Sequence, residues 1–228
     1  MKLKTILLTL TFIAVVALST HGADVFLVLK SAPGAGNKIR MEGDSSIHKW
    51  QCESTTIGGY AEVGAGFPLK PGAEVKPGKI DAKVSIFIPV SRLKSVKPDG
   101  TPDSSDMDDK VYKNLLEPKF DRITYNLTEL TLKEAPKAAD AAYQFDSKGE
   151  LCVAGVTNKI TMPVMVTVLA ENKVKFAGGT TVKMSDFKIV PPALTVMGIG
   201  ITTSDDVKLF FEWTAYKKST NPPAGTAK

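Results

Sequence analysis

Strict alternation of apolar and polar residues runs through much of this chain and predicts β-strands. In the clearest run, residues 160–168, an apolar side chain occupies every even position: Ile160, Met162, Val164, Val166 and Val168. Successive side chains of a strand point to opposite faces, so this run is expected to bury one face only. Pro163 lacks an N–H and therefore marks an edge, a bulge or an unpaired site of the ladder.

Similar runs predict one antiparallel all-β domain of eight or more strands. The expected strands are 25–29, 38–43, 46–56, 60–63, 80–90, 122–132, 142–146, 150–153, 160–170, 174–182 and 207–215. A switch of apolar phase within 122–132 predicts a bulge near Glu129. Segments rich in glycine, proline or polar residues predict loops at 64–78, 94–105 and 133–140, a turn or bulge at 147–149, a connection at 155–159 and irregular structure at 185–200.

A single segment shows helical periodicity. Its apolar residues recur at every fourth position: Met107, Val111 and Leu115. Ser104 or Ser105 would cap this helix, and Pro118 would end it. Its first turn would hold three acidic residues: Asp106, Asp108 and Asp109. Carboxylates suit the positive end of the helix dipole, and the ligand spacing of a calcium loop is missing.

The N-terminal segment 1–22 is typical of a secretory signal peptide. Lys2 and Lys4 precede an apolar run over residues 6–18, and small residues follow it. The run is short for a membrane span, although an uncleaved anchor is the alternative. We therefore expect a periplasmic or secreted protein with one domain over 24–216. The tail 217–228 is small and polar, and we expect it to be disordered.

Charge and cysteine content narrow the function classes. Removal of Lys2 and Lys4 lowers the formal charge of +5 by two, to +3, and the remaining lysines are scattered among acids. This pattern argues against nucleic-acid binding and leaves transient contact with an anionic membrane open. Cys52 and Cys152 could form a disulfide in an exported protein, or be two separate buried thiols. The long apolar strand faces also leave a homodimer open.

The chain offers little for catalysis. His48 is the only histidine outside the signal segment, and it shares a strand face with Trp50 and Cys52 rather than with a carboxylate or a serine. A zinc site needs three or four ligands at characteristic spacing. We therefore expect no catalytic residues, no metal and no cofactor. His48 is interpreted as a hydrogen-bonded strand or mouth residue, with a headgroup contact as the alternative.

Four motifs in this order resemble the YceI family of secreted lipocalin-like barrels, which is associated with polyisoprenoid binding. They are GDSSIHKW at 43–50, LLEPKFDRITY at 115–125, GELCVAGVTNKITMPV at 149–164, and TTVKMSDFKI at 180–189 followed by DVKL at 206–209. The chain departs from the family pattern in three places. The proline expected before the strand of Ile123 is absent, Tyr125 replaces a phenylalanine, and 107–109 replaces the arginine expected before the helix.

The resemblance implies an extended eight-stranded antiparallel barrel with a short helical insert near one end. Its lumen would hold an isoprenoid tail, such as that of a quinone or polyprenyl lipid, and the helix would gate it. Strand phase places these residues inward: Trp50, Ile86, Ile88, Tyr125, Val164, Val166, Phe176, Phe211 and Trp213. His48, Val111 and Leu115 complete the expected ligand-binding set. The rival hypothesis is a ligand-free structural or interaction module whose own aromatic side chains fill the barrel.

Overall fold

The computed structural model describes residues 27–31, 36–136, 138, 141–170, 173–196 and 199–217. The expected signal peptide at 1–22 lies outside these residues, as does the expected tail from 218 onward. Lys217, the first residue of that tail, is the last residue of a strand.

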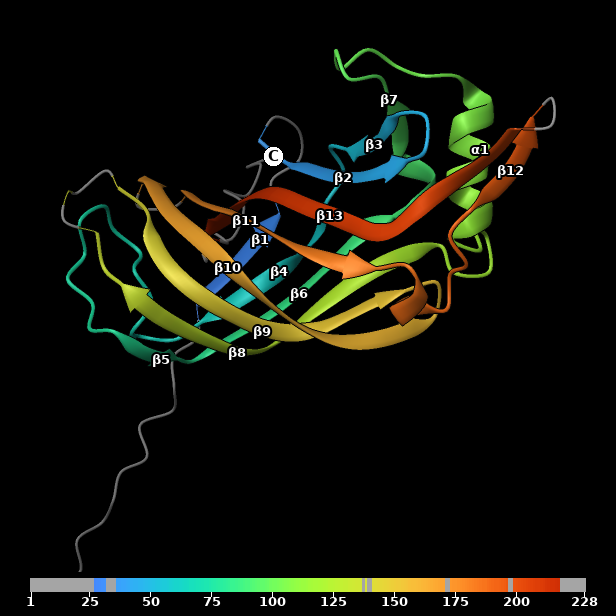
Figure 1. Ribbon diagram of the computed structural model, residues 1–228. Helices are drawn as coiled ribbons and strands as arrows, with labels where there is room; N and C mark the ends of the chain where they lie inside the picture. The colour runs from blue at the N-terminus through green and yellow to red at the C-terminus, as the bar shows by residue number, and fades with distance from the viewer. Residues whose placement is uncertain are drawn as a thin grey trace, which may run out of the picture.

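Eight antiparallel strands close into a barrel, which confirms the predicted fold class (Figure 1). Around the barrel they are β1 (Leu27–Ser31), β4 (Gly58–Val63), β6 (Ala82–Pro89), β8 (Arg122–Glu134), β9 (Tyr143–Val153), β10 (Val156–Ala170), β11 (Lys173–Lys183) and β13 (Ile199–Lys217). Pairing of β1 with β13, for example Leu29 with Lys217, closes the ring. Closure leaves no open sheet edge along this part of the wall.

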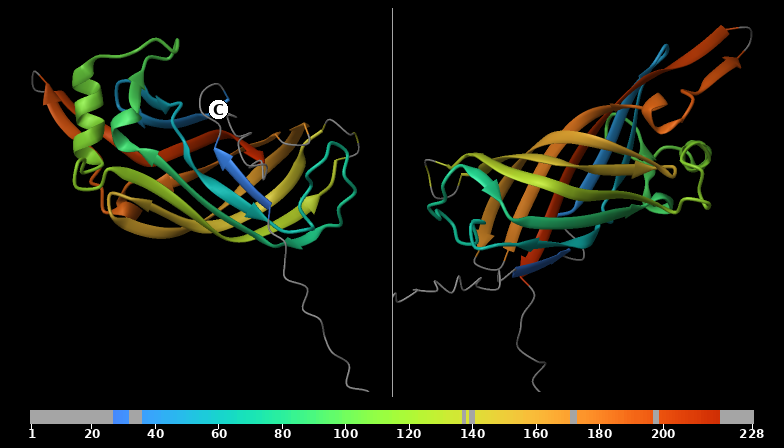
Figure 2. Two further views of the ribbon diagram at one scale, coloured as in Figure 1. Left: turned by 180° about the vertical axis from the view of Figure 1, so that it is seen from behind. Right: turned by 90° about the horizontal axis from the view of Figure 1, so that it is seen from below.

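The wall differs between the two ends of the barrel because one edge of β13 has two successive partners. Residues 215–217 pair with β1, whereas 203–212 pair with β2 (Lys38–Ser45). From β2 the sheet continues to β3 (Lys49–Ser54) and β7 (Lys94–Val96). The helix α1 (Ser105–Asn114) stands at this second end, as both views of Figure 2 show.

The remaining elements are short. The strand β5 (Gly78–Ile80) pairs with β8, and β12 (Ala193–Val196) pairs with the start of β13 in a hairpin that projects beyond the barrel (Figure 1). Two 3-10 helices, η1 (Val90–Arg92) and η2 (Ser185–Phe187), follow β6 and β11. The expected irregular segment at 185–200 and the expected loop at 94–105 were therefore partly wrong. They contain the short strands β7 and β12, which have no clear alternation of their own and form by pairing with β3 and β13, and the first residues of β13.

The hairpin between β9 and β10 turns earlier than expected. Ala154 and Gly155 have φ values of 49° and 79°, and Val153 pairs with Val156. Positive φ at both central residues is the signature of a tight two-residue turn. The expected connection at 155–159 was thus wrong beyond Gly155, and the turn or bulge expected at 147–149 was also wrong. Residues 147–149 keep an unbroken register with β10, because neighbouring strands pair with both edges of β9.

Other local predictions are confirmed. The register between β8 and β9 shifts between Leu127 and Glu129, where the phase switch predicted a bulge. Ser104 occupies the N-cap position of the helix, although its side chain makes no capping hydrogen bond, and the helix ends at Asn114, before Pro118. Pro163 lies just beyond Val164, whose pairing with Gly178 is the last between β10 and β11, so it occupies an unpaired site of that ladder.

Side chains fill the barrel at the end closed by β1 and β4, which we call the packed half. Its centre is a cluster of aromatic rings from different elements: Phe67, Phe145, Phe176 and Trp213. Ring centroids lie 5.9 Å apart for Phe67 and Phe145, and 5.1 Å apart for Phe176 and Trp213. Phe67 comes from the loop after β4 and reaches this cluster from outside the strand pattern. The end beside β3, β7 and α1 is different, and we call it the hollow half.

Candidate functional site

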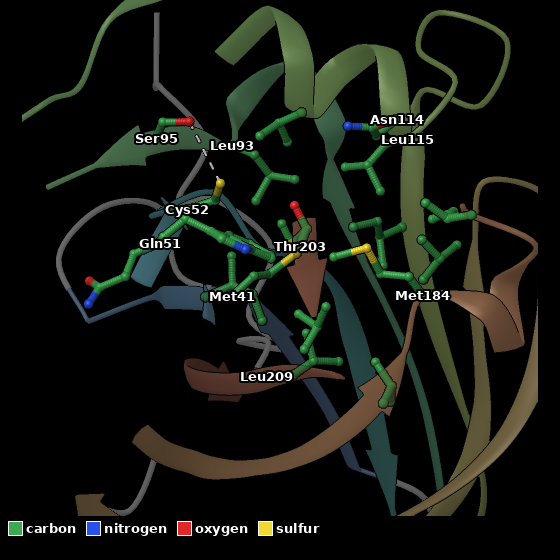
Figure 3. Close-up of a pocket in the computed structure, with 18 of the residues that line it drawn as sticks. Met41, Gln51, Cys52, Leu93, Ser95, Asn114, Leu115, Met184, Thr203 and Leu209 are labelled. Carbon is green, nitrogen blue, oxygen red and sulfur yellow. Dashed lines mark hydrogen bonds between the residues drawn. The ribbon is translucent and has the colours of Figure 1, made fainter. Parts of the chain in front are cut away.

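The hollow half contains a cavity of about 840 Å³ (Figure 3). Side chains from the barrel strands, from β2 and β3, and from α1 and the residue after it line this cavity, among them Met41, Cys52, Leu115 and Leu209. Its volume falls within the roughly 300–1,000 Å³ typical of small-molecule sites, and its lining is mainly apolar. The cavity is therefore suited to an apolar ligand of small-molecule size.

The cavity wall follows directly from strand alternation. Ile86 and Ile88 on β6, and Leu209 and Phe211 on β13, are separated by two positions and share the inner face. Ile86, Leu209 and Phe211 remain partly exposed although they point inward. Val166 has the same inward phase in the packed half and is 0% exposed. The difference in exposure reflects empty space inside the hollow half.

One face of α1 covers part of the mouth. Met107, Lys110, Val111 and Asn114 follow the spacing that brings residues onto one helix face, and all of them line the cavity. The following residue, Leu115, also points into it (Figure 3). Apolar side chains therefore lie toward the interior, while the lysine and the amide offer polar groups at the opening.

Polar contacts attach α1 to β7. The Asp108 carboxylate accepts a hydrogen bond from the Ser95 backbone N–H at 2.6 Å and one from Lys94 Nζ at 2.9 Å. The Tyr112 hydroxyl donates to the Leu93 carbonyl oxygen at 2.8 Å. Hydrogen bonds to Tyr112 and Asp108 hold the pKa of Lys94 above its ordinary value. Sequence reasoning assigned Asp108 only to the helix dipole and missed this anchoring role, because its partners lie more than ten residues away.

Tyr125 lies where the two halves of the barrel meet. It lines the cavity, and its hydroxyl forms a hydrogen bond of 2.6 Å with Ser147 Oγ, which is buried on the neighbouring strand β9. Burial raises the pKa of the Tyr125 hydroxyl above its ordinary value, and the hydrogen bond to Ser147 opposes part of this rise. The ring therefore runs along the wall from the cavity toward the packed half.

The turn between β2 and β3 carries His48 at the rim. The Ser45 hydroxyl donates to the His48 carbonyl oxygen at 2.7 Å, and His48 Nδ1 lies 2.9 Å from the Lys49 carbonyl oxygen. His48 lines the cavity but is exposed. This arrangement agrees with a hydrogen-bonded mouth residue.

The described part of the chain lacks two kinds of feature. No group of three or more His, Cys, Asp or Glu side chains in it could hold a metal ion. None of the helices described here has the length and apolar composition needed to cross a membrane.

Comparison with known proteins identifies the family. The YceI-like domain matches residues 46–215, which include most of the barrel and the cavity. The chain belongs to the YceI-like family. No curated protein matches its sequence.

Two solved structures share the YceI-like fold at low sequence identity. BcnA from Burkholderia cenocepacia is 15% identical, with a TM-score of 0.54 over 78% of this chain and 95% of BcnA. A polyisoprenoid-binding domain from Saccharophagus degradans, implicated in plant cell wall breakdown, is 10% identical. Its TM-score is also 0.54, over 85% of this chain and 99% of that domain. At these identities the likeness concerns the fold alone.

The YceI-like barrel brings most of the predicted ligand-binding residues to the cavity. Those that line it are Trp50, Ile86, Ile88, Val111, Leu115, Tyr125, Phe211 and His48. Those that do not are Val164, Val166, Phe176 and Trp213, which lie in the packed half. The two sets share the same inward phase, and phase does not report how far the lumen is filled. Ligand contact by any of them stays a prediction.

Several cavity residues were missed. Met41 and Leu209 lie on predicted strands, and their alternation with polar neighbours could have revealed them. Leu93 and Met184 follow strands in irregular segments, where periodicity gives no signal. Their place in the cavity depends on tertiary structure (Figure 3).

The disulfide considered above is not present, since both cysteines are free. Cys52 lies in the cavity wall with its Sγ 3.7 Å from Ser95 Oγ (Figure 3). Burial raises the pKa of the Cys52 thiol to about 11, so it is protonated at neutral pH. Cys152 follows the cavity residue Leu151, and strand alternation turns it to the outer face. The barrel wall thus separates the two thiols.

Proposed function

We propose that this YceI-like protein is an exported carrier that holds an isoprenoid tail in the hollow half of its barrel. The observation that carries this proposal is the apolar cavity of about 840 Å³, open beside α1. The tail would lie among the inward side chains of the strands, and the headgroup of a quinone or polyprenyl lipid would lie at the mouth. Lys110, Asn114 and His48 are among the polar residues that line the cavity.

Burial of the tail supplies the driving force. Each methylene-equivalent carbon transferred from water to an apolar interior gains about 0.8 kcal/mol. A tail of several isoprene units would therefore bind without polar contacts along its length. The name of the Saccharophagus degradans domain, polyisoprenoid-binding, supports this choice of ligand.

The rival hypothesis, a ligand-free structural module, requires a barrel filled by its own side chains. Such filling occurs in the packed half, around Phe67 and Trp213. The empty volume in the other half favours the carrier. We further propose that no catalytic step and no cofactor are involved, since the contact described for the His48 imidazole is with the Lys49 carbonyl oxygen and not with a carboxylate or a serine hydroxyl.

Export and membrane contact complete the proposal. The segment 1–22 would direct the chain to the periplasm or the medium. Ile47 and Leu194 are 58% and 51% exposed, and both line the cavity at its outer edge. The Ser46 backbone N–H donates to the Thr202 carbonyl oxygen at 2.9 Å, which joins the β2–β3 turn to the projecting hairpin. This apolar edge would support transient contact with a lipid bilayer. The same edge would alternatively form the interface of a homodimer.

Native mass spectrometry of the exported protein, purified gently from its native host and followed by lipid extraction, tests the proposal. A stoichiometric adduct with the mass of an isoprenoid is expected. Leu209→Trp should obstruct the cavity and abolish the adduct, whereas Lys208→Trp, on the outer face of the same strand, should retain it. An empty protein that also fails to take up added quinone or polyprenol would contradict the carrier hypothesis and favour the structural module.

A further inference from the structure

Two glycines occupy inward-facing positions of the barrel wall, and each is covered by an aromatic ring that comes from a neighbouring strand and lines the cavity. Gly43 on β2 pairs with Trp50 on β3, and Gly149 on β9 lies beside Tyr125 on β8. A Cβ atom on Gly43 would lie 2.1 Å from Trp50 Cζ2, and one on Gly149 would lie 2.4 Å from Tyr125 Cζ. Both distances are far below van der Waals contact. A side chain at either glycine and the observed ring position are therefore mutually exclusive.

Backbone geometry does not explain these glycines. The glycines with positive φ include Gly59 and Gly155, but neither Gly43 nor Gly149. A glycine inside a strand costs about 0.5–1 kcal/mol relative to alanine. The feature that requires glycine at both positions is the ring lying over it, an arrangement known to stabilise glycines in sheets.

The consequence for the cavity is geometric. Trp50 and Tyr125 both line it, and their rings lie along the wall instead of projecting into the lumen. The hydrogen bond between the Tyr125 and Ser147 hydroxyls fixes the direction of the second ring. An alanine Cβ at Gly149 would lift this ring off β9 and into the space that a ligand would occupy.

We propose that Gly43 and Gly149 determine the ligand specificity of the cavity by setting its width. This inference rests on the proposed function, because it concerns the same cavity. An isoprenoid chain carries a methyl branch on every unit and is wider than an unbranched alkyl chain. With both rings flat on the wall, the lumen is wide enough for the branched chain. A displaced ring would narrow the lumen and weaken binding of the branched chain more than binding of an unbranched chain.

The barrel offers a matched control on its outer face. Gly58 on β4 pairs with Phe87 on β6, and a Cβ atom there would lie 2.3 Å from Phe87 Cζ. Phe87 lies between the inward residues Ile86 and Ile88, so it points outward, under the Arg122 guanidinium at 4.6 Å. Gly58→Ala therefore displaces a ring from a strand glycine in the same way, without touching the cavity.

The test is a native mass spectrometry titration of the delipidated protein with two probes, geranylgeraniol and hexadecanol. The two alcohols have the same main-chain length, and only the first carries methyl branches. Gly43→Ala and Gly149→Ala should weaken geranylgeraniol binding by about tenfold or more, and hexadecanol binding by less. Gly58→Ala should bind both probes as the wild type does. Tyr125→Leu added to Gly149→Ala should restore geranylgeraniol binding, which a misfolded variant would not show.

The outcomes separate the two proposals. A wild-type protein that binds neither alcohol would overturn the proposed function and this inference with it. A wild type that binds geranylgeraniol, with Gly43→Ala and Gly149→Ala indistinguishable from Gly58→Ala, would overturn the inference alone. If Gly43→Ala and Gly149→Ala lost affinity for both alcohols equally, the inference that these glycines set the width of the cavity would also be overturned.

Discussion

The two ends of strand β10 have the same side-chain alternation and lie in different surroundings. Val164, Val166 and Val168 point into the packed half and are at most 6% exposed. Ile160 and Met162 point to the same side of the sheet and line a cavity. Strand phase therefore decides which residues face inward, and residues from other elements decide whether that interior is filled.

The filling side chains of the packed half come from several parts of the chain. Phe67 lies in the loop after β4, Phe145 and Phe176 lie on β9 and β11, and Trp213 lies on β13. In the hollow half the aromatic rings of Trp50 and Tyr125 lie over glycines and leave the centre open. We conclude that one half of the barrel maintains the fold and that the other is available for a ligand.

The largest expected difference between the halves concerns Trp213 and Phe211, two positions apart on the same face of β13. Trp213 is 2% exposed and stacks on Phe176, so Trp213→Ala should lower the free energy of unfolding by about 3–5 kcal/mol. Phe211→Ala should cost clearly less, because its ring borders empty space. Urea unfolding measures both values. Equal losses would show that the halves are packed alike.

Adding volume provides the converse test. Val164 is surrounded by packed side chains, so Val164→Trp should destabilise the protein by about 3 kcal/mol. Leu209→Trp has the cavity to accept its ring, and thermal unfolding should change little while lipid uptake is lost. A severe loss of stability for Leu209→Trp would contradict the assignment of free space to the hollow half.

The pKa of the Cys52 thiol depends on how far the wall of the hollow half excludes water. Its pKa is raised from 9.0 to about 11 by burial, so the folded protein retains this proton over a pH range in which the unfolded chain loses it. Stability should therefore fall by up to about 2 kcal/mol as pH rises from about 9 to 11. The free energy of unfolding, measured across this pH range, should fall less steeply for Cys52→Ala than for the wild type. Identical slopes for the two proteins would show that the Cys52 thiol is exposed to water.

The smallest expected effect concerns the attachment of α1 at the mouth. Asp108→Ala removes the acceptor for the Ser95 N–H and for Lys94, and should cost about 1 kcal/mol of stability. Asp109→Ala, on the exposed side of the helix, should change it by less than about 0.5 kcal/mol. Hydrogen exchange of the α1 amides should rise only in the first variant. Equal exchange in both would show that Asp108 does not hold the helix to β7.

The features predicted from the sequence are those carried by local patterns. Alternation predicted the long strands, four-residue spacing predicted α1, and a phase switch predicted the bulge at Glu129. The motifs predicted the barrel class, and the YceI-like match confirms it. The tight turn at Ala154 and Gly155 was misplaced because Val156 to Lys159 contains residues common in turns, although tertiary pairing makes it strand.

The division into two halves could not be predicted from the pattern. Val164, Val166, Phe176 and Trp213 satisfy the same inward phase as Ile88 and Phe211. The sets differ in what packs against them in three dimensions, including Phe67 from the loop after β4. The rings over Gly43 and Gly149 depend on cross-strand register, which a single sequence does not specify. The apolar lining of the cavity was therefore predicted in part, and the boundary between the two halves of the barrel was not.

Photo-crosslinking with a diazirine-bearing geranylgeraniol, followed by mass spectrometric mapping of the labelled residues, tests the central claim most directly. If the hollow half holds the isoprenoid chain, the label should be found on cavity residues such as Met41, Ile88 and Leu209. It should be absent from Val166 and Phe176 in the packed half. Labelling confined to the packed half or to the outer surface of the barrel would contradict the account.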